Sequence, residues 1–343
     1  MLSTPYVITL ILTITLVIFF LVPYLFPSKH PVHISVSDEL EDLVLFRRAT
    51  LASISTPSYS FKPKIAFLFL TTSHLPLSPL WNKFFLHHQN PHLYNIYIHS
   101  DPTYRTSNSF TGVFSGRVIL SKPTERASPT LISAERRLLA TALMDDHMNM
   151  YFSLLSPSCI PLHSFSYVYN SLFHPPKKFK QNLDLISYIE ILTNVSYLPD
   201  RYDARGEGVM LPELPYHKFR AGSQFFVLNR KHALLVINEQ KLWRKFRLPC
   251  INIFSCYPEE HYFPTLLSIQ DPMACSHYTL TRVNWTNCFD GHPNTYRPSD
   301  VTPNLIYKLR QSNHSFDYLF ARKFSPDCLD KLMDISNEVI FQD

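Results

Sequence analysis

The stretch KIAFLFL, residues 64–70, decides the fold class of this chain. It is a short continuous apolar run, and a run of this kind predicts a strand that is buried on both faces. Parallel sheets acquire two covered faces because their connecting helices pack on both sides. The segments that follow should therefore supply further strands and the helices that cover them.

Strand-like and helix-like segments alternate after this first strand. The predicted helices are LSPLWNKFFLHHQNP (77–91), SPTLISAERRLLATALMDD (128–146) and SFSYVYNSLF (164–173); the predicted strands are YNIYIHSDP (94–102), RVIL (117–120) and YFSLLSPSCIPL (151–162, with a loop). Ser128 is a candidate N-cap and Pro129 suits a first helical turn. The alternation predicts an α/β layer fold with a largely parallel sheet.

The composition indicates a folded chain and argues against several classes of protein. Of 343 residues, 45% are hydrophobic and only 17% are charged, so disorder is excluded. Six glycines leave little material for a glycine-rich phosphate loop, while 27 prolines stiffen the loops. The net charge of +5 is spread, and the basic residues of 228–247 flank an apolar, helix-like run. We therefore expect no nucleic-acid partner, because such partners need clustered cations with stacking aromatics.

The N-terminus predicts a membrane anchor followed by a stem. Residues 1–28 carry no charged side chain and are long enough to span a bilayer. Residues 29–63 are polar and serine-rich, with one helical candidate at 38–48, and residues 64–343 form the predicted catalytic domain. A cleaved signal peptide is the alternative, although the run lacks a basic start and a clear cleavage site. Lys29, Arg47 and Arg48 follow the run, so the positive-inside rule does not favour a lumenal C-terminal part.

Sequons and cysteines favour a lumenal location. Asn194, Asn284 and Asn313 each begin an N-x-[ST] sequon and are predicted glycosylation sites. The six cysteines are an even number, as disulfides require, but they allow fifteen pairings. No C-x-x-C pair occurs, which argues against a structural zinc site.

Two carboxylates stand where a ligand site of an α/β protein is expected. Asp101 ends a predicted strand, and ligands bind beyond the carboxyl ends of such strands. It suits hydrogen bonds to a base or ribose; the alternative is a turn aspartate before Pro102. Glu135 shares a helical face with Leu131, Leu138 and Ala142. Glu135 is either a buried carboxylate that orients other side chains of the site or a carboxylate at the rim of the apolar stripe.

The segment CYPEEHYFPTLL, residues 256–267, places two glutamates and a histidine between two prolines. A helix that begins at or just after Pro258 puts Glu259 and Glu260 in its first turn, where the helix dipole favours negative charge. The functional alternative is that one glutamate acts as a general base. From the residues alone, both interpretations stand.

If the general base serves sugar transfer, the departing nucleotide diphosphate develops negative charge, and cations are needed to stabilise that charge. No Asp-x-Asp motif is present to hold a metal, so no metal cofactor is expected. LFARKFSPD, residues 319–327, supplies Arg322 and Lys323, and HPNTYRPSD, residues 292–300, supplies Arg297. For each of these three cations, the alternative to a role at the diphosphate is a solvated charge on the surface.

Seven segments in order resemble the plant branch of the core-2/I-branching β-1,6-N-acetylglucosaminyltransferase-like proteins of glycosyltransferase family 14. They are KIAFLFLTT, YNIYIHSDP, ISAERRLLATAL, FSLLSPSCIPL, FRAGSQFFVLNRKHA, CYPEEHYFPTLL and LFARKFSPD. The resemblance covers about residues 64–331. It implies a variant GT-A fold with a Rossmann-like nucleotide-binding half, and inverting chemistry without a metal.

The resemblance also implies roles for individual residues. Glu260 maps to the catalytic base, with Glu259, an aspartate in the family, and His261 tuning or positioning it. Lys323 maps to the lysine that stabilises the diphosphate, and Asp101 to the aspartate that reads the nucleotide. Trp285 looks like the tryptophan of the acceptor platform. The animal enzymes carry a partner arginine upstream, at a spacing that differs from this chain, and Arg297 is the candidate for its place. Arg322 is a donor-side candidate because it stands next to Lys323. Plant members often carry a tryptophan where this chain has TERASPT (124–130), so the donor side departs from the family pattern.

Together these features predict a Golgi type II membrane enzyme with its catalytic domain in the lumen. It would move N-acetylglucosamine, glucuronic acid or xylose from a UDP-sugar to a hydroxyl of a glycan or glycoprotein, in β linkage. The alternatives are a catalytically inactive, membrane-anchored scaffold that binds partner glycosyltransferases, and a secreted carbohydrate-binding module.

Overall fold

The computed structural model describes residues 12–18, 34–53, 62–86, 91–103, 110–175, 185–286, 288 and 292–343. The chain divides into Met1–His33 and Ile34–Asp343. Residues 12–18 are helical. Most of the predicted anchor, 1–11 and 19–28, lies outside the described residues. Within the described ranges, no helix has the length and apolar character needed to cross a membrane.

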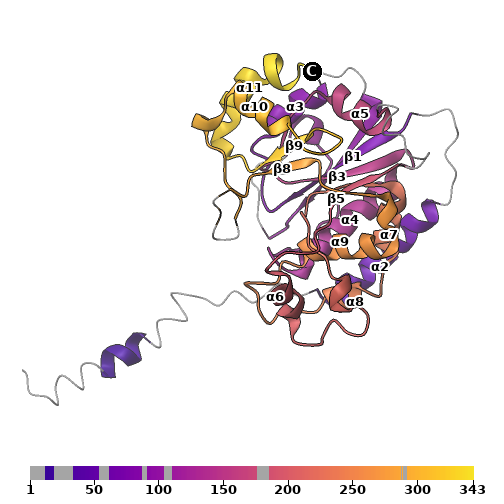
Figure 1. Ribbon diagram of the computed structural model, residues 1–343, viewed down its shortest axis with the longest axis vertical. Coiled ribbons are helices and arrows are strands. Elements are labelled where there is room, and N and C mark those ends of the chain that lie inside the picture. The colour runs from indigo at the N-terminus through magenta and orange to yellow at the C-terminus, as the bar shows by residue number, and fades with distance from the viewer. Residues whose placement is uncertain are drawn as a thin grey trace, which may run out of the picture. The chain divides into compact units, whose positions relative to one another are not determined.

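The unit Ile34–Asp343 is built on a mixed six-stranded sheet (Figure 1). In spatial order its strands are β2 (Tyr94–Ser100), β1 (Lys64–Thr71), β3 (Asn149–Leu155), β6 (Val227–Asn229), β5 (Ser187–Glu190) and β7 (Cys275–His277). β1 is central and parallel to β2 and β3, as the apolar run predicts. β6 runs antiparallel to both of its neighbours, so the prediction of a parallel sheet holds only in part.

Helices cover the central sheet on both sides, as the alternation predicts. α4 (Pro129–Asp145), α7 (Arg230–Asn238) and α9 (Glu259–Gln270) pack on one side. α3 (Ser78–Leu86), α5 (Phe165–Phe173), α10 (Pro303–Arg310) and α11 (Leu329–Ile335) lie on the other side, together with a second sheet (Figure 1). This sheet has the order β4 (Ile160–Pro161), β9 (Phe320–Arg322), β8 (Thr281–Val283).

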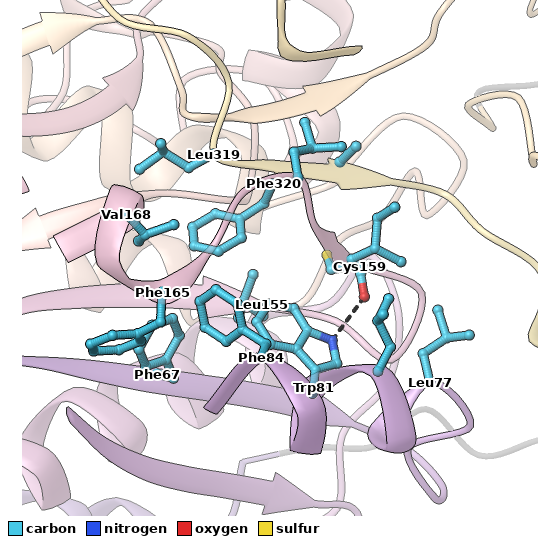
Figure 2. Close-up of a cluster of buried hydrophobic side chains, with 14 of the residues drawn as sticks. Phe67, Leu77, Trp81, Phe84, Leu155, Cys159, Phe165, Val168, Leu319 and Phe320 are labelled. Atoms are coloured by element: carbon cyan, nitrogen blue, oxygen red, sulfur yellow. Dashed lines mark hydrogen bonds between the residues drawn. The ribbon is translucent and has the colours of Figure 1, made fainter. Parts of the chain in front are cut away.

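An aromatic core joins the two sheets (Figure 2). Phe67 of β1 meets Phe84 of α3 edge-to-face at a centroid distance of 5.9 Å, and Phe320 of β9 at 6.4 Å. The indole Nε1 of Trp81 donates a hydrogen bond of 3.0 Å to the carbonyl of Cys159. A buried indole N–H needs such a partner, so this bond also fixes the loop before β4. The core therefore positions β9, which ends at Arg322.

The predicted stem contains a helix that belongs to the folded unit. α2 (Val36–Ala52) begins with a capping box between Ser35 and Asp38, and it buries Phe46 and Ala49. The compact unit thus begins at Ile34, not at residue 64. The sequence of α2 is polar because its contacts with α4 include ion pairs as well as apolar packing.

Other elements confirm or revise the predictions. Ser128 caps α4, with its side chain accepting from the N–H of Thr130, and α9 begins directly after Pro258. The run 228–247 forms two helices, α7 and α8 (Trp243–Phe246), instead of one. Segment 117–120 contributes only an isolated bridge to β2. Cys250 and Cys256 form a disulfide, and the other four cysteines are free thiols.

Candidate active site

Glu260 lies in the first turn of α9 with its side chain 28% exposed. Its Oε2 forms an ion pair with Nη1 of Arg201, which comes from α6 (Leu198–Tyr202). The guanidinium of Arg201 lies over the ring of Tyr197 at 4.2 Å and over that of Tyr257 at 4.6 Å. Such cation–π contacts hold the arginine in place. Glu260 is therefore an accessible carboxylate beside a fixed cation.

His261 positions this arginine. Its ring is buried and stacks on Phe219 at 4.6 Å. Nδ1 lies 2.8 Å from the carbonyl of Arg220, which only accepts, so Nδ1 is the donor and Nε2 the acceptor. Nε2 faces Nη1 of Arg201 at 3.4 Å. Burial lowers the pKa of His261 to about 3, so the ring is neutral and its Nε2 can accept from Arg201.

Glu259 and Glu135 are buried carboxyl groups behind Glu260. Burial, followed by the negative charge of Glu260, raises the pKa of Glu259 to about 8. Burial also raises the pKa of Glu135, although Nε2 of Gln224 donates to it at 2.6 Å. One oxygen of each glutamate has no hydrogen-bond partner in the described part of the chain. A pKa of about 8 leaves Glu259 mostly protonated at neutral pH. Burial favours the protonated form of Glu135 as well, and its full burial excludes the rim position considered for it.

Three cations gather around the end of β9. The guanidinium of Arg322 is buried and lies 4.4 Å from the centroid of Phe225. Burial, then the charges of Arg322 and Arg126, lower the pKa of Lys323. Burial lowers the pKa of Arg322 and the charge of Arg126 adds to this, while the charge of Glu260 opposes it. Among the described residues, no carboxylate forms a salt bridge with any of these three cations.

Arg126 is the member of this cluster that the sequence did not single out. It is exposed, donates from Nη1 to Nε2 of His292 at 2.8 Å, and lies 5.9 Å from the centroid of Tyr257. Its only signal in the sequence is a cation just before the Ser128 cap, in the segment where the chain departs from the plant pattern. The loop that carries it follows the carboxyl end of β2.

Asp101 fixes that loop. Its Oδ1 accepts from N and Oγ1 of Thr103 at 2.8 and 2.6 Å, and its Oδ2 accepts from N and Oγ1 of Thr124 at 2.7 and 2.9 Å. Burial raises the pKa of Asp101, but these hydrogen bonds outweigh it and hold the pKa below its usual range. The turn interpretation of Asp101 accounts for the two bonds to Thr103, whereas the two bonds to Thr124 join Asp101 to the segment that carries Arg126. A contact with the nucleotide stays a prediction.

Gly222 lets the segment before β6 pass close to the site. A Cβ at this position would stand 2.0 Å from the carbonyl oxygen of Glu190, so only glycine fits. Its N–H donates to the carbonyl of Glu260 at 2.9 Å. The close approach brings Glu190 near Glu260, and burial raises the pKa of the Glu190 carboxyl.

The remaining predicted residues lie around the C-terminal strands. The N–H of Tyr296 donates to the carbonyl of Lys323 at 2.8 Å, which places Arg297 next to the cation segment, with its own side chain exposed. Trp285 is 53% exposed in the loop after β8. Asn194 and Asn313 are exposed and Asn284 is half-buried; their glycosylation stays a prediction. No group of three or more metal-ligating His, Cys, Asp or Glu side chains occurs within the described ranges.

The chain is similar to known glycosyltransferases. Residues 65–310 match the family Core-2/I-Branching enzyme. The chain is 27% identical over 322 residues to "Glycosyltransferase BC10" of Oryza sativa subsp. japonica, covering 80% of this chain and 76% of that protein. The mixed sheet with its parallel half fits a GT-A-like glycosyltransferase. This chain belongs to the core-2/I-branching enzyme family of glycosyltransferases.

Proposed function

We propose that this protein is an inverting, metal-independent transferase that moves a sugar from a UDP-sugar to a hydroxyl of a glycan in β linkage. The observation that carries the proposal is an accessible carboxylate, Glu260, near three cations that form no salt bridge with a carboxylate of the described residues. The donor candidates are the UDP derivatives of N-acetylglucosamine, glucuronic acid and xylose. The acceptor candidates are arabinogalactan and other cell-wall glycans.

Glu260 is the proposed general base. As the acceptor oxygen attacks the anomeric carbon, its proton passes to the carboxylate, and the bond to the diphosphate breaks on the opposite face. The ion pair with Arg201 engages Oε2 and leaves Oε1 for the hydroxyl. Arg201, held by two tyrosine rings and by His261, keeps the carboxylate oriented while the substrate binds.

Arg126, Arg322 and Lys323 are the proposed binding site for the diphosphate. Their mutual repulsion in the ligand-free protein is relieved when an anion binds among them. Fixed cations of this kind stabilise the charge that develops on a leaving group. The raised pKa values of Glu259 and Glu135 support this role, because burial favours their neutral forms and a neutral acid does not cancel the positive charge.

The test is UDP release by the full chain with a panel of UDP-sugars and EDTA, comparing wild type with Glu260→Gln. We expect release with one donor, reduced about 10²–10⁴-fold in the variant, with UDP affinity unchanged. Glu338→Gln, at an exposed glutamate, is the matched control and should behave as wild type. Wild-type turnover in Glu260→Gln would refute the base. Absence of both turnover and UDP binding in the wild type would favour the scaffold alternative.

The location that suits this function is the Golgi membrane, with a single anchor and a lumenal catalytic domain. The uncharged run 1–28 and the three sequons support this part of the proposal.

A further inference from the structure

We infer that the outer face of α10 binds sugar units of the acceptor glycan that lie beyond the reacting residue. The inference rests on the proposed function, since it names part of the substrate of the same site. α10 borders an open hollow of about 540 Å³, whose lining includes Tyr296, Asp300, Asn304, Tyr307 and Lys308. Neither Glu260 nor the three cations line this hollow, so it is a separate feature of the surface.

The periodicity of α10 separates a buried face from an exposed one. Ile306 and Leu309 are buried against the core beneath the helix. Asn304, Tyr307, Lys308 and Gln311 follow the spacing of three and four that places side chains on one face, and all four are exposed. This outer face thus presents an aromatic ring, 48% exposed, between two amides.

These side chains match the chemistry of a neutral sugar. A pyranose ring has an apolar C–H face, which an aromatic ring can cover, and hydroxyls around its rim that both donate and accept. The amides of Asn304 and Gln311 each supply donors and an acceptor. Within the described part of the chain, neither amide makes a side-chain hydrogen bond. Asp300 and Lys308 have opposite charges, so the hollow favours a neutral ligand over a phosphate.

Tyr296 connects the hollow with the candidate active site. It lines the hollow, and its N–H bonds to the carbonyl of Lys323 at 2.8 Å. Its ring packs on Phe324 at 4.8 Å, and its hydroxyl is hydrogen-bonded to Asn284, the residue before Trp285. A glycan that reaches the cation segment past the Trp285 loop therefore meets this hollow next.

The experiment measures binding of short and long oligosaccharides to the full chain in detergent, by calorimetry. The probes are the disaccharide and the hexasaccharide of galactan, xylan and β-glucan. The variants are Tyr307→Ala and Asn304→Ala, and Tyr216→Ala is the control because Tyr216 is 45% exposed elsewhere on the surface. We expect one hexasaccharide to bind about tenfold more tightly than its disaccharide, which corresponds to about 1.4 kcal/mol.

The Tyr307→Ala variant should lose that advantage of length while keeping its affinity for the disaccharide and for UDP. The control, Tyr216→Ala, should retain the advantage of length. If no hexasaccharide in any series binds more tightly, or if Tyr307→Ala keeps the advantage, the inference is overturned. The UDP-release assay separates the two proposals. Turnover without a length advantage refutes only the hollow, whereas a length advantage without turnover and without UDP binding refutes the transferase and leaves the hollow as a glycan-binding surface.

Discussion

At the scale of single residues, the proposed function depends on positively charged side chains that lie close to one another. Glu260 has a cation partner in Arg201, but Arg126, Arg322 and Lys323 have one another as neighbours. Bringing like charges together costs free energy, so the cluster is expected to have a use. The proposed use is to bind the diphosphate of the donor.

Replacement of Arg126 by glutamine should therefore weaken UDP binding. We expect the dissociation constant to rise about tenfold, equivalent to about 1.4 kcal/mol, because one charge-assisted hydrogen bond to phosphate is lost. Calorimetric titration with UDP measures this effect. Arg48→Gln, at an exposed arginine of α2, should leave the affinity unchanged. Equal affinity in wild type and Arg126→Gln would remove Arg126 from the donor site.

The buried carboxyl of Glu259 should make stability depend on pH. Its pKa is about 8 in the folded protein and about 4.5 in the unfolded chain. Its contribution is complete below pH 4.5 and is lost as pH rises toward 8, because the unfolded chain releases a proton that the folded protein holds. Glutamine imitates the neutral acid, so the free energy of unfolding of Glu259→Gln should exceed that of wild type by a margin that grows across this range.

Guanidinium unfolding of both proteins at a series of pH values measures that margin. The groups that act on Glu259 are Glu135, Glu260, Arg126 and Arg205. Glu338→Gln, at an exposed glutamate, is the matched control. Parallel pH profiles for wild type and Glu259→Gln would contradict the proposed protonation.

Sequence reasoning found the residues that lie in local patterns and missed those that depend on distant contacts. Glu260 and Lys323 stand in short segments with a chemical signature. Arg201 is 59 residues from the glutamate that it pairs with, and nothing local marks it. Gly222 has an ordinary φ, and the need for glycine there comes only from the carbonyl of Glu190.

At the scale of secondary-structure elements, local patterns predicted the elements better than their partners. β1, α4 and the start of α9 follow from an apolar run, a serine cap and a proline. The direction of β6 depends on the route of the chain between β5 and β6, which no three-residue strand encodes. α2 appeared to be part of a stem, because a helix that docks partly through ion pairs lacks a wide apolar stripe.

The docking of α2 on α4 should depend on Asp42. Its two carboxylate oxygens accept from Nε and Nη2 of Arg137 at 2.5 and 2.7 Å, and both side chains are buried. Asp42→Ala leaves a buried guanidinium without its partner, which should cost about 3–5 kcal/mol. Urea unfolding of the chain from Ile34 onward measures the cost.

Glu41→Ala is the control for this prediction, because Glu41 is 58% exposed in its pair with Lys122. Glu41→Ala should lower the free energy of unfolding by less than about 1 kcal/mol. Asp42→Ala combined with Arg137→Met should recover much of the stability, since the unpaired charge is then gone. A loss in Asp42→Ala no larger than that in the control would show that α2 docks without this pair.

At the scale of the whole molecule, the chain combines a compact catalytic unit with an uncharged N-terminal run. The unit begins at Ile34, five residues beyond the first charged residue, Lys29. In the two proposals, the three cations bind the donor and the outer face of α10 binds the acceptor, so they serve the two members of one substrate pair.

The full chain should therefore remain in membranes, and the chain from Ile34 onward should be soluble and folded. Residues 1–28 carry no charge, and about twenty apolar residues suffice to cross the hydrocarbon core as a helix. Fractionation of cells that express each form, followed by alkaline carbonate extraction, distinguishes an integral anchor from surface attachment. Sequencing the N-terminus of the membrane-bound form should return residues 1–28 intact. A mature chain that starts beyond residue 28 and appears in the medium would instead identify the run as a cleaved signal peptide.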